Sequence, residues 1–170
     1  MRIIFVDGYN VLNSWPNLKQ DISGGFESTR KKLIDIMHNY GTYNNFKVYL
    51  VFDGYKVSGN IQNEEEVNKN LTIVYTKDGE TADSYIERTV HQLGRRSEIF
   101  VVTSDWLEQQ TIFQRGAVRM SSMEFYNEVL KMDEVLKKET VNNRVSDRNE
   151  LQNNIDKDVL TKLERMRRGH

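Results

Sequence analysis

The sequence has no cysteine, only three histidines and no long hydrophobic run. The lack of cysteine excludes disulfides, thiolate nucleophiles and cysteine-ligated zinc. The apolar runs fall short of the roughly 20 residues that a membrane-spanning helix needs, and the N-terminus lacks the basic region and cleavage site of a secretory signal. The histidines are scattered, so no paired-histidine metal motif is present. We therefore expect a soluble cytoplasmic protein without a membrane partner.

Neither sign of charge predominates, because 24 Lys and Arg face 25 Asp and Glu and the net formal charge is −1. The bulk basic character typical of nucleic-acid-binding proteins is therefore missing. An enzyme that concentrates acids in one site can still carry a local basic surface inside a neutral total. A length of 170 residues fits one domain with a substantial core.

Short apolar runs alternate with helical patterns along most of the chain. Strands are predicted at Arg2–Val6, Phe46–Phe52, Leu71–Tyr75, Ile99–Val102 and Ala117–Met120. Helices are predicted at Glu27–Tyr40, Thr81–Leu93, Asp105–Gln114 and Met123–Lys138. This alternation indicates an α/β fold with a mostly parallel sheet of about five strands, covered by helices on both faces.

Three further segments interrupt or extend this pattern. The irregular insert at 54–70 is expected to hold a loop and a short acidic helix around Glu64–Val67. Ser121-x-x-Glu124 is a capping box that opens the helix after the last strand. The polar stretch Glu139–Asn149 predicts a connector between a domain at 1–140 and a C-terminal helical extension at 141–170.

Four acids follow the ends of the predicted strands. Asp7, Asp53 and Asp105 come directly after strands, and Asp83 lies in the first turn of the helix after the third strand. In open parallel sheets, ligands bind beyond the carboxyl ends of the strands. Clustered carboxylates repel each other, and a hard cation such as Mg²⁺ or Mn²⁺ would explain why they gather. The four positions together predict a metal-dependent enzyme.

Each acid also has a purely structural interpretation. Asp83 is favourable near a helix N-terminus, and Asp105 with Glu108 would make a capping pair. Asp53-Gly54 is an ordinary turn dipeptide. Four acids in step with four strand exits are much less probable by accident, so the conjunction favours a site.

Two polar residues are expected to support this site. Asn10, three residues after Asp7, could orient a metal-bound water or contact a phosphate oxygen. Ser104 offers a hydroxyl beside Asp105 and could support the metal shell, although it could instead be only an N-cap.

Four segments carry the acids and their neighbours: Asp7-Gly8-Tyr9-Asn10, Val51-Phe52-Asp53-Gly54, Gly79-Glu80-Thr81-Ala82-Asp83-Ser84-Tyr85-Ile86-Glu87 and Thr103-Ser104-Asp105. Together they resemble the NYN branch of the PIN-like nuclease superfamily, in particular its YacP-like group, which includes bacterial ribosome-associated endoribonucleases. The resemblance covers about residues 1–140. It implies a three-layer α/β/α PIN-like sandwich and Mg²⁺- or Mn²⁺-dependent cleavage of single-stranded RNA, with messenger RNA on the ribosome as the expected substrate and no role for DNA.

The resemblance also assigns roles to residues. It gives catalytic and metal-binding roles to Asp7, Asp83 and Asp105, and supporting roles to Asn10 and Asp53. Asp53 is the least secure member, because acids after the second strand vary more in such enzymes. The expected reaction is phosphodiester hydrolysis by a metal-activated water.

Substrate binding needs cationic or stacking groups around the acids. The candidates are Lys56, Arg30, Tyr9, Arg88 and Lys77. Tyr9 could stack a base or be a core aromatic, and Arg88, five residues after Asp83, could face elsewhere.

Two other functions and one open role stand beside this hypothesis. A phosphatase with Asp7 as nucleophile usually has a second acid two residues later, where this chain has Tyr9. A non-catalytic RNA- or ribosome-binding module gains little electrostatic support from a charge near zero. The last helical stripe could pack on the domain, or its basic end could dock onto ribosomal RNA. The cations of that end are Lys162, Arg165, Arg167 and Arg168.

Overall fold

The computed structural model describes residues 2–54, 63–94, 97–104, 116–154 and 157–167, with side chains described as far as 146 and again at 159 and 161–167. The chain divides into two compact units, Met1–Val129 and Leu130–His170. Predictions for Lys56, Asp105, Arg168 and the helix Asp105–Gln114 lie outside the described residues. The predicted domain division after residue 140 stays a prediction.

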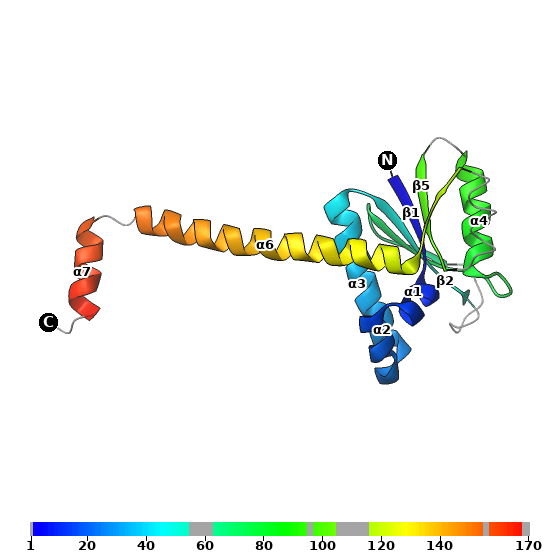
Figure 1. Ribbon diagram of the computed structural model, residues 1–170, viewed down its shortest axis with the longest axis horizontal. Helices are drawn as coiled ribbons and strands as arrows, with labels where there is room; N and C mark the ends of the chain where they lie inside the picture. Colours follow the sequence, from blue (N-terminus) through cyan, green and yellow to red (C-terminus); the bar gives the residue numbers. More distant parts are fainter. Residues whose placement is uncertain (1, 55–62, 95–96, 105–115, 155–156, 168–170) are drawn as a thin grey trace. The chain divides into compact units, whose positions relative to one another are not determined.

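A six-stranded sheet forms the centre of the first unit (Figure 1). Its strands are β1 (Arg2–Asp7), β2 (Lys47–Phe52), β3 (Asn63–Asn68), β4 (Leu71–Tyr75), β5 (Glu98–Val102) and β6 (Val118–Met120), in the spatial order β3-β4-β2-β1-β5-β6. Every neighbouring pair is parallel except β3 and β4. The α/β class and the mostly parallel sheet are confirmed, with one strand more than expected.

The central strands are almost continuous apolar runs because both faces of the sheet are covered. Phe5 and Val6 of β1 and Val51 and Phe52 of β2 are buried. β1 pairs with β2 on one side and with β5 on the other. The strand order therefore runs in opposite directions on the two sides of β1. The carboxyl end of β1 is thus the switch point, where α/β proteins bind ligands.

The segment expected to be a short acidic helix is instead the edge strand β3, so that prediction is wrong. β3 pairs antiparallel with β4, and Asn68 closes the turn by accepting hydrogen bonds from the backbone N–H groups of Asn70 and Leu71, at 2.8 and 2.7 Å. Tyr85 donates to Glu64 at 2.9 Å. Exposed glutamates on an edge strand also discourage pairing with other chains, which explains their presence there.

Helices cover both faces of the sheet. The helices that the structure describes are α1 (Gly8–Ser14), α2 (Pro16–Asp21), the short 3₁₀ helix η1 (Ile22–Gly24), α3 (Phe26–Asn44), α4 (Ala82–Leu93), α6 (Ser122–Asn154) and α7 (Lys157–Arg167), of which α7 and most of α6 belong to the second unit. Figure 1 shows α4 on one side of the sheet and α1 and α3 on the other. Ile86 and Val90 of α4 pack in one core cluster with Phe5 and Val51 of the central strands. The predicted helices at α3 and α4 are confirmed, whereas α1 and α2 were not predicted.

The capping box at the start of α6 is confirmed. The Ser121 N–H donates to Glu124 at 2.7 Å, and the Glu124 N–H donates to the Ser121 hydroxyl at 3.1 Å. The helix then continues through the stretch predicted as a connector, so that prediction is wrong. Polar residues without glycine or proline can extend a helix, and this stretch has neither. None of the described helices is long and apolar enough to cross a membrane.

Candidate active site

Asp7 lies at the end of β1 and is also the N-cap of α1. Its side chain accepts a hydrogen bond from the Asn10 backbone N–H at 3.1 Å. Gly8 allows α1 to approach β2 closely, because a Cβ there would lie 2.3 Å from the Phe52 ring. Asp7 therefore has a structural role as the N-cap of α1, and the same hydrogen bond fixes the position of its carboxyl group at the candidate site.

Asp83 lies in the first turn of α4, and two neighbouring groups fix the start of that helix. Thr81 is the N-cap and accepts from the Ser84 N–H at 3.2 Å. Asp53 Oδ1 accepts from the Ala82 N–H at 2.5 Å. Asp53 thus ties the exit of β2 to the helix that carries Asp83.

A second tie runs through Gly54. Its N–H donates to the Thr76 hydroxyl at 2.9 Å, and that hydroxyl donates to the Glu80 carbonyl at 2.6 Å. A Cβ on Gly54 would lie 1.6 Å from the Thr76 carbonyl oxygen, so only glycine fits. The loops after β2 and β4 are therefore joined directly beneath the N-terminus of α4.

The carboxyl groups of Asp7 and Asp83 are in contact at this edge. Burial raises the pKa of Asp7 from 3.8 to about 7. The Asn10 N–H opposes this shift, whereas the charges of Asp83 and Asp53 and a hydrogen bond between Asp7 and Asp83 add to it. Near neutral pH the pair favours either a shared proton or a bound cation, because both remove the repulsion between two half-buried carboxylates.

The predicted supporting residues lie beside this pair. The Ser104 hydroxyl donates to Asn10 Oδ1 at 3.0 Å and so connects the end of β5 to α1. The structure thus brings together five of the six predicted catalytic and supporting residues at the carboxyl edge of the sheet. They are Asp7, Asn10, Asp53, Asp83 and Ser104. Within the described residues, no three His, Cys, Asp or Glu side chains converge closely enough to hold a metal ion.

The predicted substrate contacts divide into two kinds. Tyr9 is only 6% exposed and packs edge-on against Phe52 at 5.3 Å between ring centroids. Of the two alternatives given for Tyr9, the structure supports the core aromatic, because its ring is covered by the core. Arg88 donates to Glu80 at 2.8 Å and lies over the Tyr85 ring at 5.3 Å, so it is engaged within the protein.

Of the two remaining candidates, Arg30 is half-buried and Lys77 is exposed. The Arg30 guanidinium lies over the rings of Phe52 and Tyr75, 5.9 and 6.0 Å from their centroids. This arrangement of one cation over two aromatic rings at strand ends was not evident from the sequence. Its signal was the repeated aromatic at the last position of β2 and β4. Lys77 is exposed in the loop after β4.

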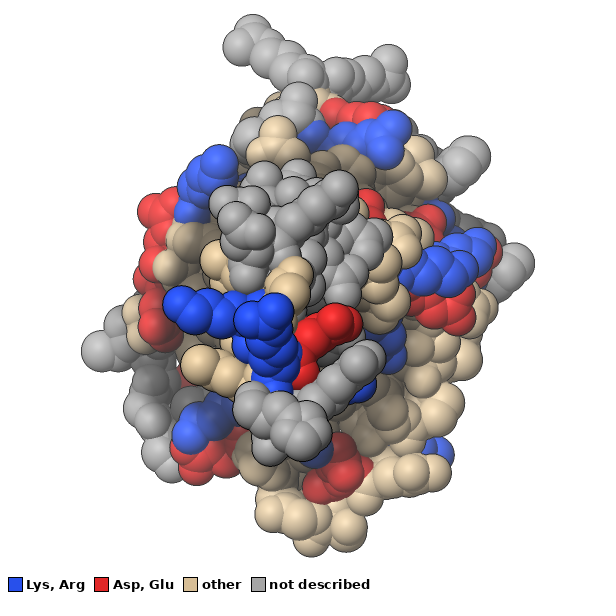
Figure 2. All heavy atoms as spheres, turned by 90° about the vertical axis from the view of Figure 1, so that its left-hand side faces the viewer, with Lys and Arg blue, Asp and Glu red and all other residues tan. Residues whose placement is uncertain are grey.

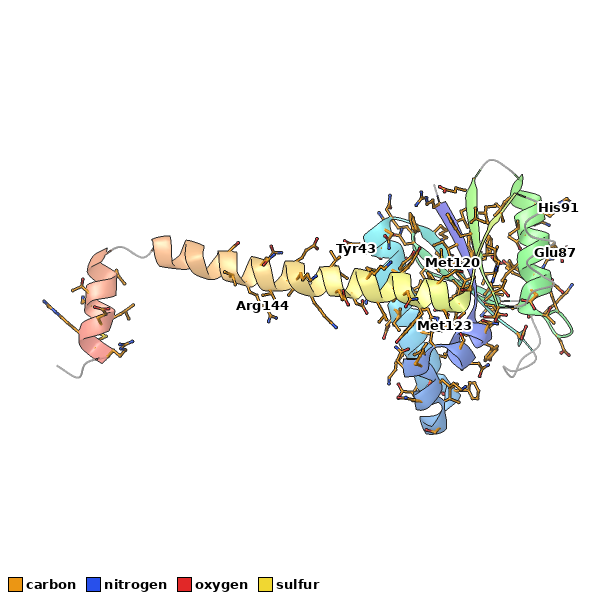
Figure 3. All side chains as sticks on the ribbon, in the orientation of Figure 1. Tyr43, Glu87, His91, Met120, Met123 and Arg144 are labelled. Carbon is orange, nitrogen blue, oxygen red and sulfur yellow. The ribbon has the colours of Figure 1, made fainter. Side chains whose placement is uncertain are left out.

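Histidine does not supply an evident base on the helix that carries Asp83. His91 lies in the last turn of α4, roughly 12 Å along the helix axis from Asp83. Figure 3 shows His91 and Glu87 on the side of α4 that points away from the sheet. Oxygen ligands therefore dominate the described part of the site, which is the donor set that Mg²⁺ and Mn²⁺ prefer.

A mostly parallel sheet with carboxylates gathered at its switch point agrees with a nuclease-type α/β fold. The family model for the YacP-like NYN domain matches residues 4–168. The chain therefore belongs to the YacP-like NYN domain family. The resemblance drawn from the four motifs is confirmed, and the family match extends through the C-terminal segment as well.

Relatives of known sequence and structure agree with this assignment. The uncharacterized protein YacP of Bacillus subtilis (strain 168) is 35% identical over 170 residues, covering 99% of this chain and 98% of the relative. The crystal structure of Rae1 (YacP) from Bacillus subtilis has a TM-score of 0.73 and 34% identity, with 99% of this chain and 96% of that chain covered. A tryptophan-to-leucine mutant of the same protein has a TM-score of 0.71 and 31% identity, covering 98% and 99%.

Proposed function

We propose that this protein is a metal-dependent endoribonuclease that hydrolyses phosphodiester bonds of single-stranded RNA. The observation that carries the proposal is the contact between Asp7 and Asp83 at the switch point of the sheet. Two half-buried carboxyl groups held together repel each other, which costs the fold free energy, so the pair is best explained by a ligand that it binds. Membership of a nuclease-type family agrees with this reading of the pair.

The ligand that fits these donors is Mg²⁺ or Mn²⁺. We propose that Asp7, Asp83 and Asp105 hold it, with Asp105 directly following Ser104 in the chain. A divalent ion there supplies a water of lowered pKa and neutralises charge on the reacting phosphate. We propose that Asn10, whose Oδ1 accepts a hydrogen bond from Ser104 at 3.0 Å, donates its amide N–H to a phosphate oxygen. Asp53 keeps the start of α4 in place, so that Asp83 stays beside Asp7.

We further propose that the substrate is messenger RNA on the ribosome, in the cytoplasm. A net charge of −1 gives little general attraction to RNA, so a separate docking element would be useful. On the face seen in Figure 2, Lys and Arg side chains (blue) are interspersed with Asp and Glu (red). In α7, Lys162, Arg165 and Arg167 are exposed, which supports this helix as the docking element.

A cleavage assay separates this proposal from a binding module or a phosphatase. The substrates are an mRNA bound to purified bacterial ribosomes, the same RNA free in solution, and a phosphate monoester, each with Mg²⁺, Mn²⁺ or EDTA. We expect internal RNA cleavage by the parent protein that EDTA abolishes. Asp7→Asn should lose it, whereas Asp35→Asn, an exposed carboxylate on α3, should keep it. No RNA cleavage by the parent, or full activity of Asp7→Asn, would contradict the proposal.

A further inference from the structure

An arginine packs against three aromatic residues at the carboxyl edge of β2 and β4, where Arg30 and Tyr75 are half-buried and Phe52 and Tyr9 are buried. Phe52 and Tyr75 end these two strands, and their rings stack at 5.7 Å between centroids with an interplanar angle of 20°. The guanidinium of Arg30 lies over both rings. Tyr9 also hydrogen-bonds Arg30. The arginine is thus held in place by residues from three other elements.

Phe26 extends this cluster to the surface. It begins α3 one turn before Arg30, and residues four apart lie on the same face of a helix. Its side chain is 49% exposed, and its ring meets the ring of Tyr9 edge-on at 6.3 Å. The structure therefore presents a partly open aromatic ring beside a fixed guanidinium.

The positive charge of Arg30 is not neutralised by a carboxylate in the described part of the chain. The other cations near it on α3 are paired, Lys31 with Glu27 at 3.5 Å and Lys32 with Asp21 at 2.6 Å. An arginine fixed by aromatic rings but left without a counter-charge is suited to an external anion, and its planar fork matches a phosphate group.

This cluster adjoins the carboxylate pair across the sheet edge. Tyr9 follows Asp7 by two residues, and burial and, to a smaller degree, the negative charge of Asp53 contribute to the raised pKa of Tyr9. Phe52 ends β2 with its ring against Arg30 of α3, whereas the next residue, Asp53, accepts a hydrogen bond from the Ala82 N–H of α4. The two side chains therefore face the two sides of the same sheet edge. A single-stranded RNA that crosses this edge of the sheet can contact the carboxylates on the α4 side and Arg30 on the α3 side.

We propose that Phe26 and Arg30, supported by Tyr9, Phe52 and Tyr75, form a subsite for one nucleotide of the RNA next to the scissile phosphate. Arg30 binds the phosphate of that nucleotide, and Phe26 stacks on its base. The inference rests on the proposed function, because it takes RNA as the substrate of the Asp7–Asp83 site. Base stacking on an exposed aromatic tolerates any sequence, so the subsite adds affinity without selecting a base.

The test measures binding in the full-length Asp7→Asn protein, in which cleavage is expected to be lost. The probes are a fluorescein-labelled 12-mer of uridylate and a 12-mer of the same backbone without bases, followed by fluorescence anisotropy. Phe26→Ala, Arg30→Ala and Arg30→Lys are compared with two controls on α3. These are Tyr43→Ala, a 44% exposed aromatic at the other end of the helix (Figure 3), and Lys31→Ala. Thermal melting of each variant reports whether the fold is intact.

Phe26→Ala should weaken binding of the uridylate probe roughly 5- to 100-fold and leave the base-free probe unaffected. Arg30→Ala should weaken binding of both probes. It should also make the dependence of affinity on salt concentration shallower, by about the amount of one phosphate contact. Arg30→Lys should restore part of the lost affinity. Equal affinities of Phe26→Ala and Tyr43→Ala would overturn the subsite, as would absence of RNA binding by the Asp7→Asn protein. Binding through Phe26 and Arg30 without cleavage by the parent would instead contradict the proposed nuclease function alone.

Discussion

Asp7 caps α1 through the Asn10 N–H while its carboxyl group is buried against Asp83. These two facts have opposite effects on the charge of the side chain, because the cap favours the carboxylate and burial favours the acid. Burial is the larger effect, so the pKa of Asp7 is about 7 in the folded protein against 3.8 for an ordinary aspartate. The residue is therefore costly to ionise when no cation is bound.

This cost gives a stability prediction with a definite sign. Between pH 3.8 and about 7 the folded state binds the Asp7 proton more tightly than the unfolded state, so stability falls as the pH rises through that window. The full penalty, on the order of 4 kcal/mol at 1.36 kcal/mol per pKa unit, is present above pH 7. In EDTA, Asp7→Asn should therefore be more stable than the parent at pH 8 and not at pH 4, since asparagine keeps the cap.

Urea unfolding at the two pH values checks this prediction. Asp35→Asn serves as the control, because its carboxyl group is exposed and its replacement should change stability by less than about 0.5 kcal/mol at either pH. A difference between Asp7→Asn and the parent that does not change with pH would show that the Asp7 carboxyl is not held protonated by burial.

Gly54 is the residue on which the geometry beneath α4 depends most sharply. Any Cβ at this position collides with the Thr76 carbonyl, so Gly54→Ala must push the loops after β2 and β4 apart. We expect a loss of about 1–3 kcal/mol of stability, as for other overpacked sites, together with reduced cleavage because Asp53 moves away from Ala82. Gly24→Ala, where the Cβ meets open space, should change neither property. Equal behaviour of the two variants in urea unfolding would contradict the role given to Gly54.

At the scale of the elements, the pattern of apolar residues predicted the strands that are buried in the core. β4 has the bounds Leu71–Tyr75 in both the prediction and the structure, because four of its five residues are β-branched or aromatic and all except Tyr75 are buried. β3 escaped prediction because three consecutive glutamates resemble a solvated helix. Its pairing is decided by partners elsewhere in the fold, such as Tyr85 for Glu64, and no local pattern records them.

The same distinction applies to the site. The positions of Asp7 and Asp83 at one sheet edge follow from strand exits that are visible in the sequence. α1 was missed because Asp7-Gly8-Tyr9-Asn10 resembles a turn, although Asp7 is a good N-cap. The placement of Arg30 over two rings depends on how α3 packs across β2 and β4, which spacing along the chain does not reveal.

The capping box of α6 gives a prediction for a single element. Ser121→Ala removes the hydroxyl that accepts from the Glu124 N–H and should lower stability by about 1 kcal/mol. The hydrogen bonds from Ser121 lower the pKa of Glu124, so this element loses support as the pH falls through the acidic range. Thermal melting at pH 7 tests the variant against Thr140→Ala, an exposed hydroxyl inside α6. A loss no larger than that of Thr140→Ala would show that the box does not matter for folding.

At the scale of the whole molecule, the C-terminal segment distinguishes ribosome docking from simple packing. Val159, Leu163 and Met166 of α7 are 48, 52 and 73% exposed, and the cations beside them are exposed too. Lys162→Glu with Arg165→Glu in the full chain should leave the melting temperature unchanged and reduce co-sedimentation with ribosomes, with the largest difference from the parent at low salt. Lys137→Glu with Lys138→Glu, a matched charge reversal in α6, is the control. Unchanged co-sedimentation would exclude α7 as the docking element.

The central claim is that Asp7 and Asp83 act together as one metal-dependent cleavage site. Its most direct test is the rate of RNA cleavage by Asp7→Asn, Asp83→Asn and the double variant, on ribosome-bound and free RNA with saturating Mg²⁺ or Mn²⁺. Groups that act as a unit are not additive. Each single variant should lose on the order of 10²-fold or more, and the double variant should be no slower than the slower single variant. Activity retained in either single variant, or losses that multiply in the double variant, would contradict the claim.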